Sequence, residues 1–179
     1  MPAAALPPLP DFETLKVKNN DGIWEESMAP WLSRFVRSLR NWHVYLPRTS
    51  TLTPGILDMW IRLASGERIT QATMLYAPGE MVEKDAQGGE LKKRDKKCGA
   101  LWFPTVVMNL LMKTALSEEG VEWLAMRITS RQIKNGRFDL DILRRDAEGE
   151  IIALSHHVAM ILSVERNAKK RKLSDKAAL

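Results

Sequence analysis

Residues 150–164 read EIIALSHHVAMILSV and form the last long apolar stretch of this 179-residue chain. Both alternate sets of side chains along it are largely apolar, which predicts a long β-strand that is covered on both faces. Because side chains alternate along a strand, the adjacent His156 and His157 should point to opposite faces. The stretch therefore predicts a buried strand that carries one imidazole on each side.

The segment before this strand predicts its hairpin partner. Residues 136–143 read GRFDLDIL, in which apolar and charged residues alternate as on a strand with one buried face. A polar DAEG turn at 146–149 would join the two strands. A long hairpin is thus expected at the end of the fold, and the rest of the chain should pack on it.

Patterns upstream predict four more strands and two helices. Strand-like apolar content marks residues 42–46, 56–63, 102–112 and 122–131. Helical spacing of apolar residues predicts an amphipathic helix at 30–40 and one long buried helix at 67–77. Pro104 marks the beginning of a strand or an edge, and Asn135 with Gly136 predicts a tight hairpin turn. The expected order is two strands, the long helix and a four-stranded antiparallel meander.

Length and composition predict one domain with two extensions. The chain is 45% hydrophobic and 27% charged, which is ordinary for a chain that buries a real core. We expect a Pro/Ala-rich lead-in or linker at 1–26, a domain at 27–165 and a basic tail at 166–179. The lead-in should be extended.

The charge pattern bears on location and partners. The net charge of +5 comes from basic clusters at 92–97 and 166–176, which a solvated loop and tail explain best. Aromatic residues are not interleaved with these clusters, so nucleic-acid binding is not favoured. No apolar run approaches the ~20 residues that span a bilayer, and the single cysteine, Cys98, suits a reducing compartment. We expect a cytoplasmic protein with no membrane contact; KKRK at 169–172 and AAL at 177–179 are weak nuclear and peroxisomal signals.

Three segments, taken in order, carry a resemblance to a known family. They read WIRLASGE at 60–67, WFPTVVMNLL at 102–111 and NGRFDLDILRRDAEGEIIALSHHVAMIL at 135–162. This ordered set resembles acyl-CoA thioesterase II and the wider thioesterase-like superfamily with the hotdog fold. The resemblance covers residues 40–165 and is nearest to the C-terminal half of members with two hotdogs.

The resemblance implies an α+β fold, in which a curved antiparallel sheet wraps around one long helix. The amphipathic helix at 30–40 would be an addition to that fold. Hotdog units generally work in pairs, so the resemblance implies a homodimer or pairing with another hotdog chain. The Pro-rich start would then be a linker that follows a first hotdog.

The resemblance also implies catalytic positions. In the family, an acid near the end of the central helix acts with a Thr or Ser and a Gln to position the water that attacks a thioester carbonyl. The hydroxyl position falls at Thr105, four residues before Asn109, and the Gln position falls at His157. No carboxylate stands at 76–79, where the acid should lie, and Glu80 is the nearest substitute.

A repaired mechanism needs a new base. A neutral imidazole at His157 can serve, with Thr105 and Asn109 orienting the water and N–H groups at the start of the 67–77 helix receiving the oxyanion. The purely structural alternatives are that His157 is a hydrogen-bonded core histidine, that the Thr105 hydroxyl bonds backbone groups at the start of a strand, and that Glu80 is a surface residue. Asn109 inside a strand favours a polar site or a dimer seam.

The leading hypothesis is a thioesterase-like protein that hydrolyses an acyl or polyketidyl thioester of CoA or a carrier protein, in fatty-acid or secondary metabolism. The acyl chain would lie near Met108, Met112 and Met160, between paired subunits. A hotdog dehydratase, isomerase or cyclase is one alternative, and a non-catalytic binding or assembly module is another. No metal or other cofactor is expected, because His156 and His157 diverge.

Overall fold

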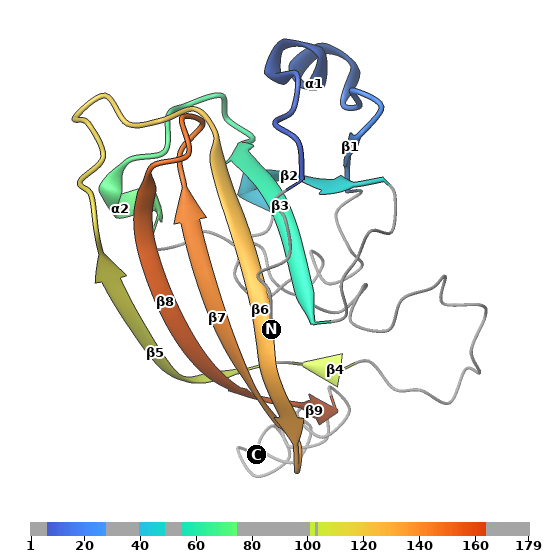
Figure 1. Ribbon diagram of the computed structural model, residues 1–179, viewed down its shortest axis with the longest axis vertical. Helices are drawn as coiled ribbons and strands as arrows, with labels where there is room; N and C mark the ends of the chain where they lie inside the picture. Colours follow the sequence, from blue (N-terminus) through green and yellow to red (C-terminus); the bar gives the residue numbers. More distant parts are fainter. Residues whose placement is uncertain (1–6, 28–39, 49–54, 75–100, 103, 164–179) are drawn as a thin grey trace, which may run out of the picture.

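A computed structural model describes residues 7–27, 40–48, 55–74, 101–102 and 104–163. It contains two helices and nine strands, as labelled in Figure 1: α1 (Phe12–Lys18), β1 (Trp24–Glu26), β2 (Trp42–Pro47), β3 (Ile56–Leu63), α2 (Gln71–Met74), β4 (Leu101–Trp102), β5 (Thr105–Met112), β6 (Leu124–Lys134), β7 (Arg137–Arg145), β8 (Ile151–Met160) and β9 (Leu162–Ser163). No helix in these ranges is long and apolar enough to cross a membrane.

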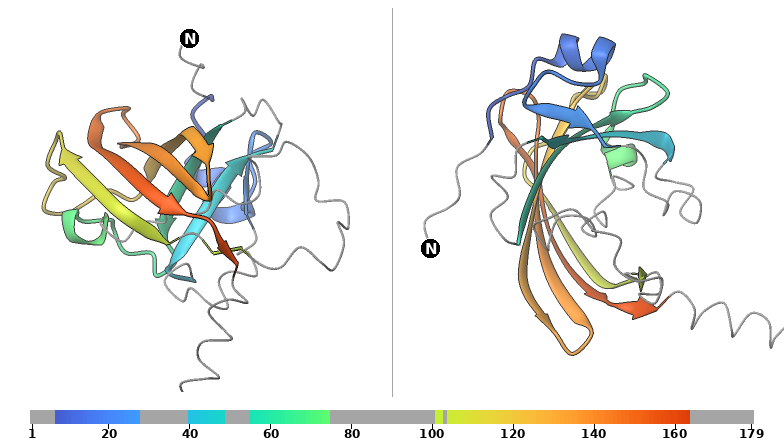
Figure 2. Two further views of the ribbon diagram at one scale, coloured as in Figure 1. Left: turned by 90° about the horizontal axis from the view of Figure 1, so that it is seen from below. Right: turned by 90° about the vertical axis from the view of Figure 1, so that its right-hand side faces the viewer.

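Seven strands form one antiparallel sheet in the order β1-β2-β3-β6-β7-β8-β5, and β4 pairs with β9 separately. The sheet curves strongly when seen edge-on, with α2 on its concave side (Figure 2, right). We call the concave side the inner face; it carries the main core cluster, which includes Met59, Ile128, Ile142 and the α2 residue Met74. The convex side is the outer face. The expected curved antiparallel sheet is confirmed.

Local sequence signals place the strands well. The predicted strands at 42–46, 56–63, 122–131 and 136–143 correspond to β2, β3, β6 and β7. Asn135 and Gly136 both have positive φ, 54° and 70°, as a tight hairpin turn of the type I′ requires. Pro104 lies just before β5, which is an edge strand of the sheet, so both expectations for this proline are met.

The prediction that the last strand is covered on both faces is wrong. On β8 the inner-face residues Ala153, Ser155, His157 and Ala159 are buried, whereas Leu154 on the outer face is exposed. The outer face of β8 is apolar although the described structure leaves Leu154 exposed. The alternation of apolar residues does not distinguish covered from uncovered apolar surface, so it could not predict this.

The predicted four-stranded meander is also wrong in one pairing. Only β6, β7 and β8 follow one another, and β5 pairs with β8 while β6 pairs with β3. The connection from β5 to β6 passes against the segment before α2, where Ile69 and Val121 form a bridge with backbone bonds of 2.6 and 3.0 Å. Gly120 makes this approach possible, since a Cβ there would lie 2.5 Å from the Ile69 oxygen.

The helix expected at 67–77 begins later than predicted. Ile69 is extended and paired with Val121, and α2 starts at Gln71. Thr70 precedes the helix: its hydroxyl accepts from the Thr73 N–H, and the Thr73 hydroxyl accepts from the Thr70 N–H. Helical structure is described as far as Met74, and residues 75–77 lie outside the described residues. Most of the helix predicted at 30–40 also lies outside them.

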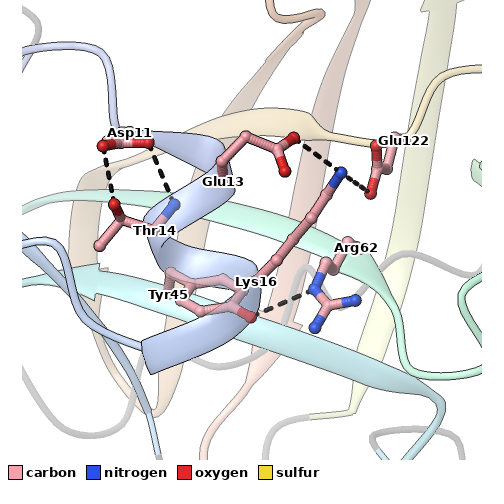
Figure 3. Close-up of polar contacts among 7 residues, drawn as sticks. All are labelled: Asp11, Glu13, Thr14, Lys16, Tyr45, Arg62 and Glu122. Carbon is pink, nitrogen blue, oxygen red and sulfur yellow. Dashed lines mark hydrogen bonds and ion pairs between the residues drawn. The ribbon is translucent and has the colours of Figure 1, made fainter.

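The expectation of an extended lead-in is wrong for residues 12–18, which form α1. The Asp11 side chain caps the helix by accepting from the Thr14 N–H at 3.0 Å and the Thr14 hydroxyl at 2.7 Å (Figure 3). Lys16 reaches from α1 to Glu122 at 2.8 Å. The helix is therefore fastened to the connection before β6, and the division into lead-in and domain at residue 26 stays a prediction.

Aromatic side chains hold α1 and β1 on the outer face of the sheet. The cluster consists of Phe12, Leu15, Trp24, Tyr45, Trp60, Trp123 and Ala125. Leu15 is fully buried in it, and Phe12 lies 5.0 Å from both Trp60 and Trp123, measured between ring centroids. The Arg62 guanidinium donates to the Tyr45 hydroxyl at 3.2 Å (Figure 3). This outer cluster gives the sheet a second, smaller core.

Candidate functional site

His157 lies on the inner face of β8, one strand from the sheet edge. It pairs across the sheet with Leu140 of β7 and with Met108 of the edge strand β5. Its side chain is 5% exposed, while Met108 is exposed. The imidazole is thus buried on the inner face, next to the edge strand β5, whose Met108 is exposed to solvent.

Three buried polar residues lie together on this wall. His157 Nε2 is 3.1 Å from the Ser155 hydroxyl oxygen, and Arg144 Nη1 of β7 donates to the same oxygen at 2.9 Å. Arg144, Ser155 and His157 are the buried polar or charged residues among those the structure describes. The inner face, otherwise apolar, therefore has one polar centre.

Burial and charge keep the imidazole neutral. Burial lowers the pKa of His157, and the positive charges of Arg144 and His156 lower it further. Burial alone lowers the pKa of Arg144 to about 10, so its guanidinium still carries its charge at neutral pH. The centre combines a neutral base with a permanent cation.

Two atoms of this centre have no hydrogen-bond partner among the described residues. They are Nδ1 of His157 and Nε of Arg144, and both are buried. Buried polar atoms are nearly always satisfied in folded proteins, and an unmet one often marks a place where water or a ligand binds. In the described part of the chain, the free ring nitrogen of His157 is the atom best suited to accept a proton from a bound water.

Thr105 lies at the beginning of β5 on the same face as His157. Its cross-strand partner is Ala159, and Ala159 and His157 are two residues apart on β8. Thr105 itself is exposed. The structure therefore brings Thr105 to the expected face, at the open edge of the sheet.

Asn109 does not share that face. A β-bulge lies between Thr105 and Val107, so β5 gains one residue and its alternation shifts. Asn109 consequently pairs with His156, whose Nδ1 contacts Asp141 at 2.9 Å on the outer face. The expectation that Asn109 would lie beside His157 is wrong, because the bulge places Thr105 and Asn109 on opposite faces.

Two other expected parts of the site have different outcomes. Glu80 lies outside the described residues. Three N–H groups near the start of α2 are already engaged: Ile69 donates to Val121, and Thr70 and Thr73 donate to each other's hydroxyls. These three groups are therefore not available as an oxyanion hole.

Within the described ranges, the polar centre includes no metal-ligand group and lines neither of two surface depressions. No group of three or more His, Cys, Asp or Glu side chains is placed to hold a metal among the described residues. On the described part of the chain, His157 lines neither the open depression near Asn135 nor the one near Gly149. Of the three expected methionines, Met108 and Met112 share the inner face with His157, whereas Met160 pairs with Arg137 on the outer face.

Sequence reasoning missed Arg144 and Ser155. Arg144 continues the alternate set of Phe138, Leu140 and Ile142, all of them buried, so parity alone places it on the inner face. Ser155 shares its parity with His157 in the same way. The available signal was a charged residue in register with an apolar set, which is rare unless the charge has a role.

Comparisons with known proteins agree with this architecture. The sequence profile of the acyl-CoA thioesterase C-terminal domain matches residues 5–161. Thioesterase-like protein TwmA from Talaromyces wortmannii is 48% identical to this chain, over 99% of the chain and 58% of TwmA. This chain therefore spans little more than half the length of that relative.

Two crystal structures share the fold. A hotdog-fold protein of unknown function from Alicyclobacillus acidocaldarius superposes with a TM-score of 0.59 at 15% identity, over 89% of this chain and 55% of that protein. A protein from Thermobifida fusca, provisionally assigned as a thioesterase II, gives 0.53 at 19% identity, over 69% of this chain and 47% of that protein. The sheet is thus a hotdog fold, and the profile match shows that the chain belongs to the acyl-CoA thioesterase C-terminal domain family.

Proposed function

We propose that this chain hydrolyses an acyl thioester and that His157 is its general base. The observation that carries the proposal is a buried, neutral imidazole on the inner face whose Nδ1 has no partner among the described residues. A general base must be unprotonated and within reach of the proton it takes, and a low pKa keeps it unprotonated. Membership of a thioesterase family supports the reaction class.

Ser155 would hold the imidazole in the productive tautomer. A hydroxyl oxygen has two lone pairs, so Ser155 can accept from Arg144 Nη1 and from a protonated His157 Nε2 together. Nδ1 then keeps its lone pair. It takes a proton from water as the water oxygen attacks the thioester carbonyl carbon. The C–S bond breaks, the imidazolium returns the proton to the leaving sulfur, and a carboxylic acid and a thiol result.

The acyl group would approach His157 from the β5 side of the sheet. Met108 and Met112 lie on the inner face of β5, opposite His157 and Ala153 respectively. Thioether side chains adapt to irregular apolar ligands, so they suit an acyl or polyketidyl chain. Thr105, on the same face, would contact the thioester from the edge. The carrier would be CoA or an acyl carrier protein.

A second hotdog unit would complete the site along β5. This strand ends the sheet and exposes four apolar side chains, Val106, Val107, Met108 and Leu111. Edge strands that are long and apolar invite pairing with another chain. We infer that a second copy, or another hotdog chain, pairs there and covers the approach to His157.

The test is thiol release from a panel of acyl-CoA and acyl-N-acetylcysteamine thioesters by wild type, His157→Gln and His157→Ala. Loss of a general base should lower kcat by about 10²- to 10⁴-fold. His156→Gln is the matched control, since His156 lies one residue away on the outer face, and it should keep most activity. Equal rates for wild type and both His157 variants would rule out His157 as the base.

Two alternatives remain as outcomes of the same panel. A dehydratase, isomerase or cyclase that uses His157 would convert the acyl group without releasing thiol, and mass spectrometry of the acyl chain would reveal it. A binding or assembly module, which the missing family carboxylate favours, would gain thermal stability with thioesters and convert none of them.

A further inference from the structure

We propose that Arg144 binds a carboxylate carried by the acyl group, so that the substrate is an acidic acyl thioester. The inference rests on the proposed function and adds the substrate class to it. Arg144 is 3% exposed on the inner face, and its hydroxyl partner Ser155 also contacts His157. A ligand that pairs with Arg144 would therefore lie next to the proposed base.

The guanidinium has no compensating anion in the described part of the chain. In the described part of the chain it donates to the neutral Ser155 hydroxyl, and no acidic side chain there forms an ion pair with it. Burial lowers its pKa, yet no nearby carboxylate raises it again. A buried charge without an opposite charge is strongly unfavourable, so an anionic group of a ligand would stabilise this one.

The edge of the guanidinium that suits a carboxylate is the one that does not contact Ser155. Nη1 donates to Ser155, and Nε has no partner among the residues that the structure describes. Nε and Nη2 form one edge of the planar group, and this edge matches the two oxygens of a carboxylate. A carboxylate is anionic before and during the reaction, so it compensates the buried cation in the bound state as well as in the transition state. A transient oxyanion on a neutral thioester does not.

The sharpest test compares two thioesters that differ only in charge. Glutaryl-N-acetylcysteamine and its methyl ester have the same acyl length, and the small thiol carries no phosphate. We expect wild type to favour the free acid by about 10- to 100-fold in kcat/KM, the range of a charge-assisted hydrogen-bonded pair. In Arg144→Met this preference should fall to near one, while Arg144→Lys should keep part of it.

Arg145→Met is the matched control. Arg145 adjoins Arg144 and also has a buried Nε that finds no partner in the described ranges. It lies on the outer face, where it pairs with Ala125 across the sheet. Its substitution should leave the preference for the free acid unchanged. Because a buried unpaired charge is costly, Arg144→Met should fold with a Tm equal to or above that of wild type.

A binding measurement separates this inference from the proposed function. Glutarate at about ten times its Kd should raise the Tm of wild type by about 3 °C and leave that of Arg144→Met unchanged. If no thioester is hydrolysed but this shift is found, the proposed function fails and the carboxylate site stands.

Three results would overturn the carboxylate site. The first is equal turnover of the acid and its methyl ester with no shift by glutarate. The second is an Arg144→Met variant that slows both thioesters by the same factor, which would place Arg144 at the reacting carbonyl. The third is a large fall in Tm for Arg144→Met, which would show that a carboxylate of the chain itself pairs with Arg144.

Discussion

The Ser155 hydroxyl and the His157 imidazole lie 3.1 Å apart on the inner face of β8, two residues apart in the chain. This contact has two chemical readings, because the hydroxyl either accepts from Nε2 or donates to it. In the first reading Ser155 orients a base that activates water. In the second, Ser155 is itself the nucleophile and Nε2 is the base.

Ser155→Ala separates these readings. We expect turnover to fall by about tenfold and to stay well above that of His157→Gln, since a positioning contact is lost and the base remains. The variant should also be less stable by about 1 to 3 kcal/mol, because Arg144 Nη1 loses its partner. Thiol release and urea denaturation measure the two effects. Turnover as low as in His157→Gln, together with an acylated Ser155 in wild type, would favour the nucleophile.

The depressed pKa of His157 predicts how stability depends on pH. Burial lowers the pKa in the folded chain, so below about pH 6.5 the unfolded chain binds a proton that the folded chain does not. The free energy of unfolding should therefore fall as the pH falls through this window. His157→Gln removes the effect, and wild type should lose up to about 1.4 kcal/mol more than the variant between about pH 7.5 and 5.5.

Urea unfolding of both proteins at several pH values measures this difference. His43 and His156 are common to both proteins. The Asp141 carboxyl is also common to both proteins. Burial raises its pKa, but hydrogen bonds from His156 and Arg131 lower it by more, so its titration lies below this window. Parallel curves for the two proteins would show that His157 titrates normally.

Gly120 should tolerate no side chain. Its φ is +75°, and a Cβ would lie 2.5 Å from the backbone oxygen of Ile69. Gly120→Ala should lower the free energy of unfolding by about 2 to 4 kcal/mol, from backbone strain and from separation of the Ile69–Val121 bridge. Gly66 is the control, since its φ is +80° with nothing within 4 Å, and Gly66→Ala should cost only about 1 kcal/mol. Similar losses for both would refute the steric argument.

A charge on the edge strand should prevent pairing with a second hotdog. Leu111 is 54% exposed on β5, and Leu111→Lys should shift the protein to monomers and lower turnover if the partner completes the site. Val17 of α1, 80% exposed, is the control position, and Val17→Lys should leave the oligomeric state unchanged. Analytical ultracentrifugation decides the matter. A wild-type protein that is monomeric at all concentrations would overturn the proposed self-pairing.

Local sequence signals predicted where the strands lie better than they predicted which strands pair with each other. Alternation and the turn at Asn135 and Gly136 fixed β7 and its hairpin, because those signals act within a few residues. The pairing of β5 with β8 depends on contacts far apart in sequence, such as the bridge from Ile69 to Val121, and no local pattern encodes them. Helix α1 was missed because it is short and charged, and its single buried residue, Leu15, gives no periodicity.

The candidate site divides in the same way. Parity on one strand was enough to separate His156 from His157, and it would also have found Arg144 and Ser155. It failed for Asn109, because parity counts residues and a bulge adds one.

That extra residue changes how spacing in this chain should be compared with spacing in its relatives. Val106 is the residue that the bulge adds between Thr105 and Val107, and its side chain is exposed. A relative with one residue fewer at this point would align with a gap and still place the same two side chains on the same two faces. Deletion of Val106 should accordingly be tolerated, whereas deletion of Leu110 should exchange the faces of the residues on one side of it. In a library of single-residue deletions across β5, the deletion that leaves the protein folded would identify the position of the bulge.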